Sequence, residues 1–196
     1  MTAREGGPQS GDQFMAPPEL VTPVKLLIAI LWSTADSLAA ALQELEKNWG
    51  AIDYSGADIP FEITDYYQAE MGLDLKRRLV TCEPLIPPEA IRPYKLRCNQ
   101  LEAELASSRG RTVNLDLGFL DHNKLVLASC KYAGQKIHLG DGIYADLIAR
   151  YEGGRYQPFA WSFPDFKDGR YDEDLLQIRQ RYLQQLRAWR ASVPSS

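Results

Sequence analysis

VKLLIAILW, residues 24–32, is the longest apolar run of the chain and limits which fold the segments around it can form. It has the length of a strand but not the polar–apolar alternation of a half-exposed one, which is typical of a central strand covered on both faces. A membrane-spanning helix needs about 20 apolar residues, so the same run predicts no membrane partner. We therefore expect a buried strand here.

An amphipathic helix follows this strand directly. Ser33 or Thr34 can cap its start, and Gly50 is a typical residue just past a helix end. Between them, apolar side chains recur at helical spacing, at Leu38, Leu42, Leu45 and Trp49. A strand and a helix therefore open the domain.

Strand and helix patterns continue along the rest of the chain. Pro88 suits the first turn of a second long helix, and residues 121–123 and 140–141 have the composition of turns between strands. The predicted strands are residues 61–63, 76–85, 111–120, 124–130, 135–139, 142–151 and 155–160. The remaining predicted helices are residues 65–71, 88–107 and 172–189.

This order predicts an α+β fold, with a largely antiparallel mixed sheet and helices packed on one face. The first part has the order β-α-β-β-α-β and can form a ferredoxin-like unit, extended by a β-meander and a C-terminal helix. Residues 1–22 are rich in Gly, Pro, Gln and Ser, and predict a disordered N-terminal extension. Residues 23–192 are expected to form a single α+β domain.

Composition narrows the class of protein. Its 45% hydrophobic and 24% charged residues are ordinary for a globular chain. The 26 acidic and 22 basic residues leave a net charge of -4, and the basic ones are dispersed, which argues against nucleic-acid binding. The three cysteines are not closely spaced and the N-terminus lacks the apolar core of a secretory signal. We therefore expect a cytoplasmic protein whose cysteines are small buried side chains.

Motifs with a fixed chemical meaning are missing from the sequence. There is no GxxxxGK[ST] loop, no GxGxxG after a strand and no GxSxG. His122 and His138 are the only histidines, and they lie on separate predicted elements without the spacing of metal ligands. The sequence predicts no metal site, so candidate residues come from clusters of polar side chains.

Two helical segments carry such clusters. On the short helix, Tyr66 and Glu70 share a face beside Tyr67 and can form a proton-transfer or hydroxyl-binding pair; alternatively, the glutamate is solvated and the tyrosines pack. On the second long helix, a base, an amide and an acid form a stripe that either lines a cleft or forms an exposed, salt-bridged flank. These residues are Lys95, Asn99 and Glu102.

The strands and hairpins that follow add further candidates. Asn114 and Asp116 point the same way from one strand, and burying them without partners is costly, so they are either exposed or part of a site. The next hairpins carry donors and an acceptor that can meet a phosphate or carboxylate, or that are simply solvated. These residues are Lys131, Gln135, Lys136 and Asp141.

An aromatic segment, WSFPDF at residues 161–166, comes last before the C-terminal helix. Trp161 can wall a pocket, with Asp165 directed by the turn at Pro164. The same aromatic side chains can instead seal the edge of the sheet against the final helix. The sequence leaves both interpretations open.

Several blocks taken together resemble the DUF4416 family, which is uncharacterised. They are FEITDYYQAEMG, the K-x-x-x-N-x-x-E helix, VNLDLGFL, KLVLAS, IHLGDGIYADL, which contributes Tyr144 to the candidate residues, and WSFPDF. Where the family pattern reads HRIYL this chain reads QKIHL, so Gln135 replaces a histidine that can act as a base. Some members are labelled GTP-binding, and that label is all that the resemblance implies about a ligand. The chain reads NKLV at residues 123–126, not the guanine-reading NKxD.

These observations lead to three hypotheses. The first is a protein that binds a small anionic ligand, such as a nucleotide or a phosphorylated metabolite, in a polar cleft. The second is a carboxylate-based enzyme, with Glu70, Asp116 or Asp165 as catalytic candidates and Mg²⁺ as a cofactor that carboxylates can bind. The third is a non-catalytic interaction domain, which predicts an exposed apolar patch near Trp161 and Phe166. The sequence predicts no oligomeric state.

Overall fold

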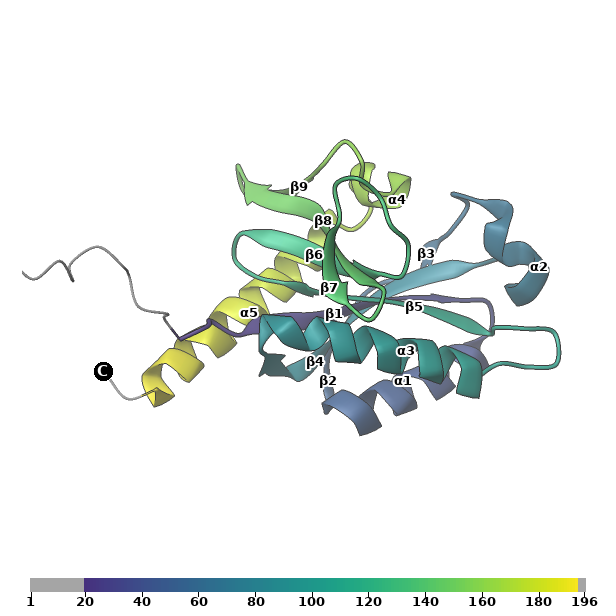
Figure 1. Cartoon of the computed structure of the whole chain (residues 1–196), viewed down its shortest axis with the longest axis horizontal. Helices are drawn as coiled ribbons and strands as arrows, with labels where there is room; N and C mark the ends of the chain where they lie inside the picture. Colours follow the sequence, from purple (N-terminus) through teal and green to yellow (C-terminus); the bar gives the residue numbers. More distant parts are fainter. Residues whose placement is uncertain (1–19, 194–196) are drawn as a thin grey trace, which may run out of the picture.

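A computed structural model of the chain describes residues 20–193 and shows a 9-stranded sheet with helices on both of its faces (Figure 1). The strands are β1 (Val24–Trp32), β2 (Ile52–Ser55), β3 (Ile59–Pro60), β4 (Lys76–Ile86), β5 (Val113–Leu120), β6 (Lys124–Ser129), β7 (Ile137–Gly140), β8 (Ile143–Glu152) and β9 (Arg155–Pro158). The helices are α1 (Ala35–Trp49), α2 (Gln68–Met71), α3 (Ile91–Glu104), α4 (Pro164–Lys167) and α5 (Asp172–Ser192), with the short 3₁₀ helices η1 (Asp65–Tyr67) and η2 (Pro88–Ala90).

The strand order is β2-β4-β1-β5-β6-β8-β7, with β3 beside β4 and β9 beside β8. Each of these pairings is antiparallel. The predicted α+β class with a largely antiparallel sheet is therefore confirmed. The ferredoxin-like unit stays an analogy of element order, and the single domain at residues 23–192 stays a prediction. The predicted disordered extension at residues 1–22 lies almost wholly outside the described residues.

β1 is the centre of the sheet, and all of its residues are buried, as predicted for a strand covered on both faces. Its even-numbered residues, such as Ile28, pack against α1 and α3. Its odd-numbered residues Leu27 and Ala29 belong to a second core that includes Ile178 and Tyr182 of α5. Because successive strand side chains point to opposite faces, a fully apolar strand needs a cover on each side.

The expectation that the helices pack on one face is wrong for α5. Its apolar stripe covers the face opposite to α1 and α3. Both faces of β1 are apolar, so a single layer of helices would leave one face exposed to water. The apolar sequence of β1 therefore already required a layer of side chains on each face of the sheet.

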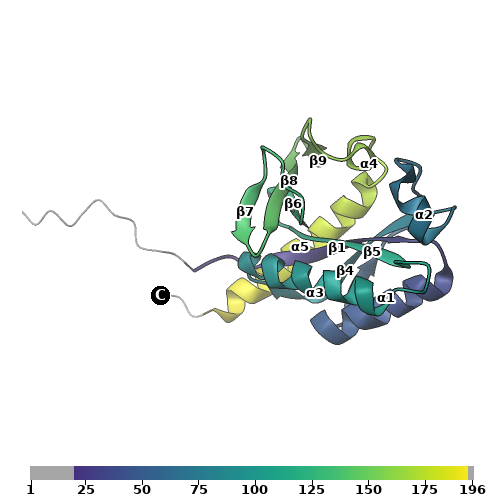
Figure 2. The ribbon, with the colours of Figure 1, turned by 45° about the vertical axis from the view of Figure 1, so that its right-hand side comes forward.

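The sheet splits between β5 and β6. β5 pairs with β1 along Val113–Leu120, but with β6 only over Gly118–Leu120. At Gly118 the strands are so close that a Cβ atom would lie 2.0 Å from the carbonyl oxygen of Val126. Figure 2 shows β6, β7 and β8 rising away from β5, with α2 and α4 on the other side of the opening. The first half of β5 is therefore left without a second strand neighbour among residues 20–193.

Some local predictions differ from the structure. The short strand predicted at residues 61–63 lies at Ile59–Pro60, and α4 was not predicted. Cys82 and Cys98 are buried as expected, and burial raises the pKa of the Cys82 thiol to about 12. Cys130 is exposed, because the chain leaves β6 just before it. No helix in the described part of the chain combines the length and apolar character needed to cross a bilayer.

Candidate functional site

A cavity of about 330 Å³ lies where β5 and β6 separate. Its wall comes from α3, β4, β5, β6, β8 and the segments around η1 and α4. Its charged residues are the cations Arg77, Lys95, Arg111, Lys131 and Lys136 and the carboxylates Glu102, Asp116, Asp146 and Asp165. A volume near 300 Å³ is at the lower end of the range for small-molecule sites. We call this space the split-sheet cavity.

The polar stripe of α3 takes the place of the missing strand. Glu102 Oε1 accepts a hydrogen bond from the backbone N–H of Leu115 at 2.7 Å, and Lys95 Nζ donates to the carbonyl oxygen of Leu115 at 2.8 Å. Lys95 and Glu102 are both buried, with Nζ and Oε1 4.0 Å apart. A buried backbone group needs a hydrogen-bond partner. These two side chains supply the partners of the Leu115 N–H and carbonyl on the free edge of β5, and the same bonds hold the side chains in place.

Burial raises the pKa of the Glu102 carboxyl, against the opposing effects of Lys95 and of the Leu115 N–H. A charged carboxylate in a sheltered site is disfavoured relative to its neutral form. Groups with such shifts are concentrated at functional sites. Glu102 is therefore the carboxyl of this wall that most resembles a proton donor or acceptor.

The Glu102 shift leads to a pH prediction. The folded state binds this proton more tightly than the unfolded state, so the carboxylate costs stability as pH rises from its ordinary pKa of 4.5 through the raised folded-state value. Glu102→Gln keeps an oxygen for the Leu115 N–H but does not titrate. The unfolding free energy of this variant, minus that of the wild type, should rise across that window and then level off in urea titrations. A difference that is flat or falls with pH would contradict the assignment.

Arg77 lies at the base of the cavity between two carboxylates. Its Nη1 donates to Asp165 Oδ2 at 2.5 Å and its Nη2 to Asp116 Oδ2 at 3.0 Å. The guanidinium also lies over the ring of Phe61, 4.4 Å from its centroid. Tyr171 adds a hydroxyl donor to Asp165 at 3.0 Å. These contacts fix the Asp116 carboxylate, which is the more exposed of the two acids, at the cavity wall.

The β6–β8 side contributes a second buried ion pair. Lys136 Nζ lies 3.2 Å from Asp146 Oδ2 and donates to Ser129 Oγ at 2.9 Å. Both charged side chains are almost fully buried. Buried pairs contribute little to stability compared with apolar packing. Their presence in one cavity wall therefore points to a role other than stabilising the fold.

The η1–α2 segment borders the mouth of the cavity. Arg111 Nε donates to Glu70 Oε2 at 2.7 Å, and the Arg111 guanidinium lies 5.6 Å from the ring centroid of Tyr67. The Lys131 ammonium lies 4.8 Å from the ring centroid of Tyr66. The bond from Arg111 lowers the pKa of Glu70, which makes that carboxylate a weaker base. Glu70 also does not line the cavity, so its place in the structure is that of a salt-bridge partner.

Unpartnered polar atoms are concentrated in the same wall. Among the described residues, buried side-chain atoms without a hydrogen-bond partner include Arg77 Nε, Asn114 Nδ2, Asp146 Oδ1 and Asp165 Oδ1, which all belong to cavity-lining residues. Leaving such a group unpaired costs about 1–3 kcal/mol. Natural proteins tend to keep costs of this kind at functional sites.

The structure brings most of the candidate residues together around the split-sheet cavity: Tyr66, Tyr67, Lys95, Asn99, Glu102, Asn114, Asp116, Lys131, Lys136 and Asp165. It places Gln135, Asp141, Tyr144 and Trp161 elsewhere. Gln135 lies in the turn before β7, and Asp141 pairs with Arg92 at 3.1 Å on the surface. Tyr144 packs beside His138, with ring centroids 5.0 Å apart.

Sequence reasoning missed six polar members of the wall: Thr64, Arg77, Arg111, Ser129, Cys130 and Asp146. Arg77 and Asp146 lie within strands, Arg111 lies just before β5, and Cys130 lies just after β6. Asn99 Nδ2 lies 3.2 Å from the Cys130 sulfur. Arg77 shares a strand face with the apolar Leu79, which was an available signal, since arginine is rarely buried without a partner.

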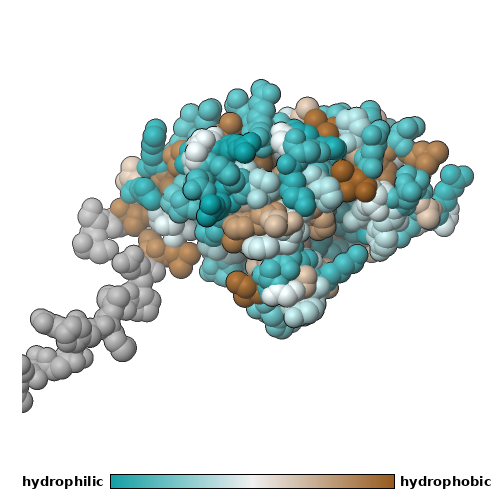
Figure 3. Space-filling view, turned by 90° about the horizontal axis from the view of Figure 1, so that it is seen from above, coloured by the Kyte–Doolittle hydropathy of each residue, from teal (hydrophilic) through white to brown (hydrophobic). Residues whose placement is uncertain are grey.

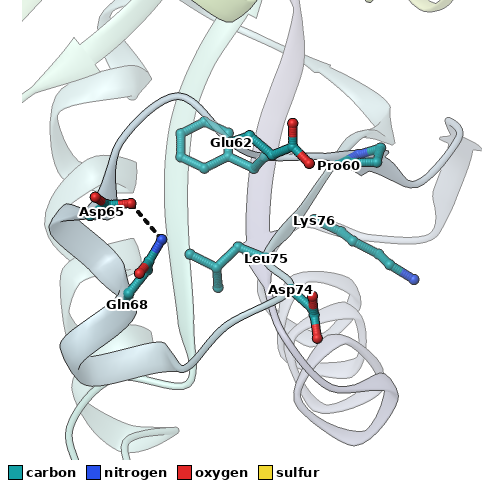
Figure 4. A pocket seen from close by; sticks show the side chains of 8 residues that line it. Pro60, Glu62, Asp65, Gln68, Asp74, Leu75 and Lys76 are labelled. Carbon is teal, nitrogen blue, oxygen red and sulfur yellow. Dashed lines mark hydrogen bonds between the residues drawn. The ribbon is translucent and has the colours of Figure 1, made fainter.

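A separate cavity of about 370 Å³ lies beside β3, η1 and the start of β4. Figure 4 shows Leu75 at its centre, Asp65 joined to Gln68 by a hydrogen bond of 2.6 Å, and Lys76 pointing away. Lys76 is the only cation in this lining, against three carboxylates (Glu62, Asp65 and Asp74). Its charge therefore suits an anionic ligand less well than the split-sheet cavity does.

The aromatic segment divides between core and surface, because Phe166 is buried whereas Trp161 and Phe163 are each about half exposed. Phe166 is 6% exposed and belongs to the core under α5, so it cannot take part in the surface predicted for an interaction domain. Trp161 is half-exposed, stacks on Phe159 with ring centroids 4.7 Å apart, and donates from Nε1 to the Leu147 carbonyl. The face shown in Figure 3 carries small apolar patches separated by hydrophilic side chains.

Comparisons with known proteins give one result. A family model described as a domain of unknown function, DUF4416, matches residues 22–182, which is most of the chain. Neither the curated proteins nor the solved structures gave a match. Within residues 20–193, no group of three or more His, Cys, Asp or Glu side chains is arranged to hold a metal ion.

Proposed function

The chain belongs to the DUF4416 family, whose description assigns no activity, and from the site alone we propose that it binds a small anionic ligand in the split-sheet cavity. A phosphorylated metabolite or a nucleotide has the required charge. The observation that carries the proposal is the convergence of five cations, from four separate parts of the chain, on one cavity of about 330 Å³.

Not all of these cations are equally available to a ligand. Arg77 and Lys136 are committed to buried carboxylates, and Arg111 is committed to Glu70. Lys95 makes a single hydrogen bond, to the Leu115 carbonyl, although an ammonium has three donors. Lys131 has no carboxylate within 4.0 Å in the described structure. These two lysines therefore have the donor capacity that an anion needs.

A binding experiment tests the proposal. We expect a panel of nucleotides and sugar phosphates, including GTP with and without Mg²⁺, to contain a compound that raises the thermal stability of the wild type. Lys95→Met and Lys131→Ala should each weaken its binding by about 10- to 100-fold in calorimetry, because a charge-assisted hydrogen bond contributes about 1.5–3 kcal/mol.

Lys76→Met is the matched control, because Lys76 lines the other cavity. Its affinity should equal that of the wild type. Lys131 is exposed, so its variant tests binding without a risk to the fold. The proposal fails if no compound binds at millimolar concentration, or if only Lys76→Met weakens binding.

A carboxylate-based enzyme is the second candidate, and the raised pKa of Glu102 is the observation that favours it. Asp116 lines the same cavity and keeps its place as a candidate, whereas Glu70 is engaged by Arg111. Proton transfer to carbon can be followed as solvent deuterium entering the bound compound, with nuclear magnetic resonance as the readout. Exchange that persists unchanged in Glu102→Gln and Asp116→Asn would rule out these acids as its catalysts.

A further inference from the structure

Three carboxylates of the split-sheet cavity, Asp116, Asp146 and Asp165, have one oxygen on a cation and the other without a partner, and Asp165 is the most buried of them. Asp116 Oδ2 accepts from Arg77, and Asp146 Oδ2 pairs with Lys136. Asp146 Oδ1 is buried and unpartnered, and no hydrogen bond reaches Asp116 Oδ1 from the described residues. The Asp116 side chain is partly exposed, so its remaining oxygen is open to a ligand. The cavity wall therefore presents carboxylate oxygens that lack a hydrogen-bond donor.

The missing donors are neutral groups and not further cations. Each carboxylate already has a guanidinium or ammonium beside it. What its second oxygen lacks is a hydrogen-bond donor, and a ligand hydroxyl supplies one without adding charge. A site with buried acceptors also discriminates strongly against an analogue that lacks the hydroxyl, since the acceptors then stay unpaired.

Hydrogen-bond donors that lack acceptors lie on α3, on the segment between β6 and β7, and on β5. Lys95 and Lys131 have unused donors, and the amide nitrogen of Asn114 is buried without an acceptor. These donors suit the oxygens of a phosphate group, which accepts several charge-assisted hydrogen bonds at once. One cavity thus offers donors for an anion and acceptors for hydroxyls.

We propose that the ligand is a phosphate monoester of a polyol, with its phosphate on Lys95 and Lys131 and its hydroxyls on Asp116 and Asp146. This inference rests on the proposed function, because it names the class of anion that the same cavity binds. It predicts that inorganic phosphate and simple alkyl phosphates bind at the same lysines but more weakly, because they lack the hydroxyls. The cavity volume of about 330 Å³ suits a compound of this small size.

Glycerol 3-phosphate and n-propyl phosphate are a matched pair of probes, since they differ only by two hydroxyls. In calorimetry with the wild type, glycerol 3-phosphate should bind at least about tenfold more tightly than n-propyl phosphate, the difference expected from one good hydrogen bond to a charged acceptor. Asp116→Asn should lower the affinity for glycerol 3-phosphate by about tenfold, and should leave the affinity for n-propyl phosphate unchanged or slightly higher.

The outcomes separate this inference from the proposal beneath it. If both esters bind with equal affinity and Lys95→Met weakens both, the anion site stands and the polyol assignment is overturned. If glycerol 3-phosphate does not bind, the polyol assignment is overturned, and the anion site fails with it only when no compound of the nucleotide and sugar phosphate panel binds either. Comparing the two esters on the wild type needs no variant, so a folding defect in Asp116→Asn cannot hide the answer.

Discussion

Replacing Arg77 by methionine is expected to lower the free energy of unfolding by about 3–5 kcal/mol, the usual cost of removing one partner of a buried ion pair. Arg77 is 4% exposed and Asp165 is 1% exposed, so the substitution leaves a carboxylate sheltered from water with only the Tyr171 hydroxyl beside it. Urea unfolding followed by circular dichroism measures the change. The same variant should release Asp116 and so weaken ligand binding.

Arg78 provides a matched control for Arg77. It is the next residue of β4, and it pairs with Asp58 at 2.6 Å near the surface. Because exposed pairs contribute about 0–1 kcal/mol, Arg78→Met should change stability by no more than that. A second check combines Arg77→Met with Asp165→Leu, which removes the orphaned charge and should recover stability. If Arg77→Met costs no more than Arg78→Met, Arg77 does not hold a buried charge network together.

Replacing Lys25 by methionine should have an effect of similar size, about 3–5 kcal/mol. Lys25 is 0% exposed, and its ammonium donates to Asp53 Oδ2 at 2.5 Å, the Cys82 carbonyl at 2.7 Å and Gln185 Oε1 at 2.8 Å. The bond to Gln185 ties α5 to the start of β1. The substitution removes the cation paired with the partly buried Asp53 carboxylate, which then keeps only the neutral donors of Thr81 and Gln185, and it removes the Lys25 donor of the Cys82 carbonyl; both losses are costly.

Lys47 is the control for Lys25. It pairs with Glu44 at 2.6 Å on the exposed face of α1, and Lys47→Met should cost less than about 1 kcal/mol. Hydrogen exchange adds a local readout, because the C-terminal turns of α5 should exchange faster in Lys25→Met than in Lys47→Met. Equal stability of the two variants would show that the Lys25 contacts are not maintained in solution.

The elements of the fold could be predicted because their signals are local. The apolar run of β1, the Thr34 cap with Gly50 at the end of α1, and the hairpin turns depend on neighbouring residues. The position of α5 was missed because it depends on which face of the sheet stays uncovered, a property of the assembled layers. Periodicity identifies an amphipathic helix but not the surface against which it packs.

The candidate site shows the same division. Lys95, Asn99 and Glu102 form a helical stripe, so their common direction was readable from their spacing. The contact of Lys95 and Glu102 with Leu115 could not be predicted from the sequence, because it depends on the separation of β5 and β6 at Gly118. Strand register is set by contacts between distant segments. Arg77 and Asp146 were missed for that reason, since each looks like an ordinary strand residue until the sheet splits beside it.

The most direct test of the split-sheet cavity as an anion site is a crystal soaked in tungstate, a heavy analogue of phosphate, with its anomalous scattering measured. We expect the strongest anomalous peak inside this cavity, within hydrogen-bonding distance of Lys95 Nζ and on the side of Lys131. Peaks confined to surface lysines or to the cavity beside Lys76, with none near Lys95, would contradict it.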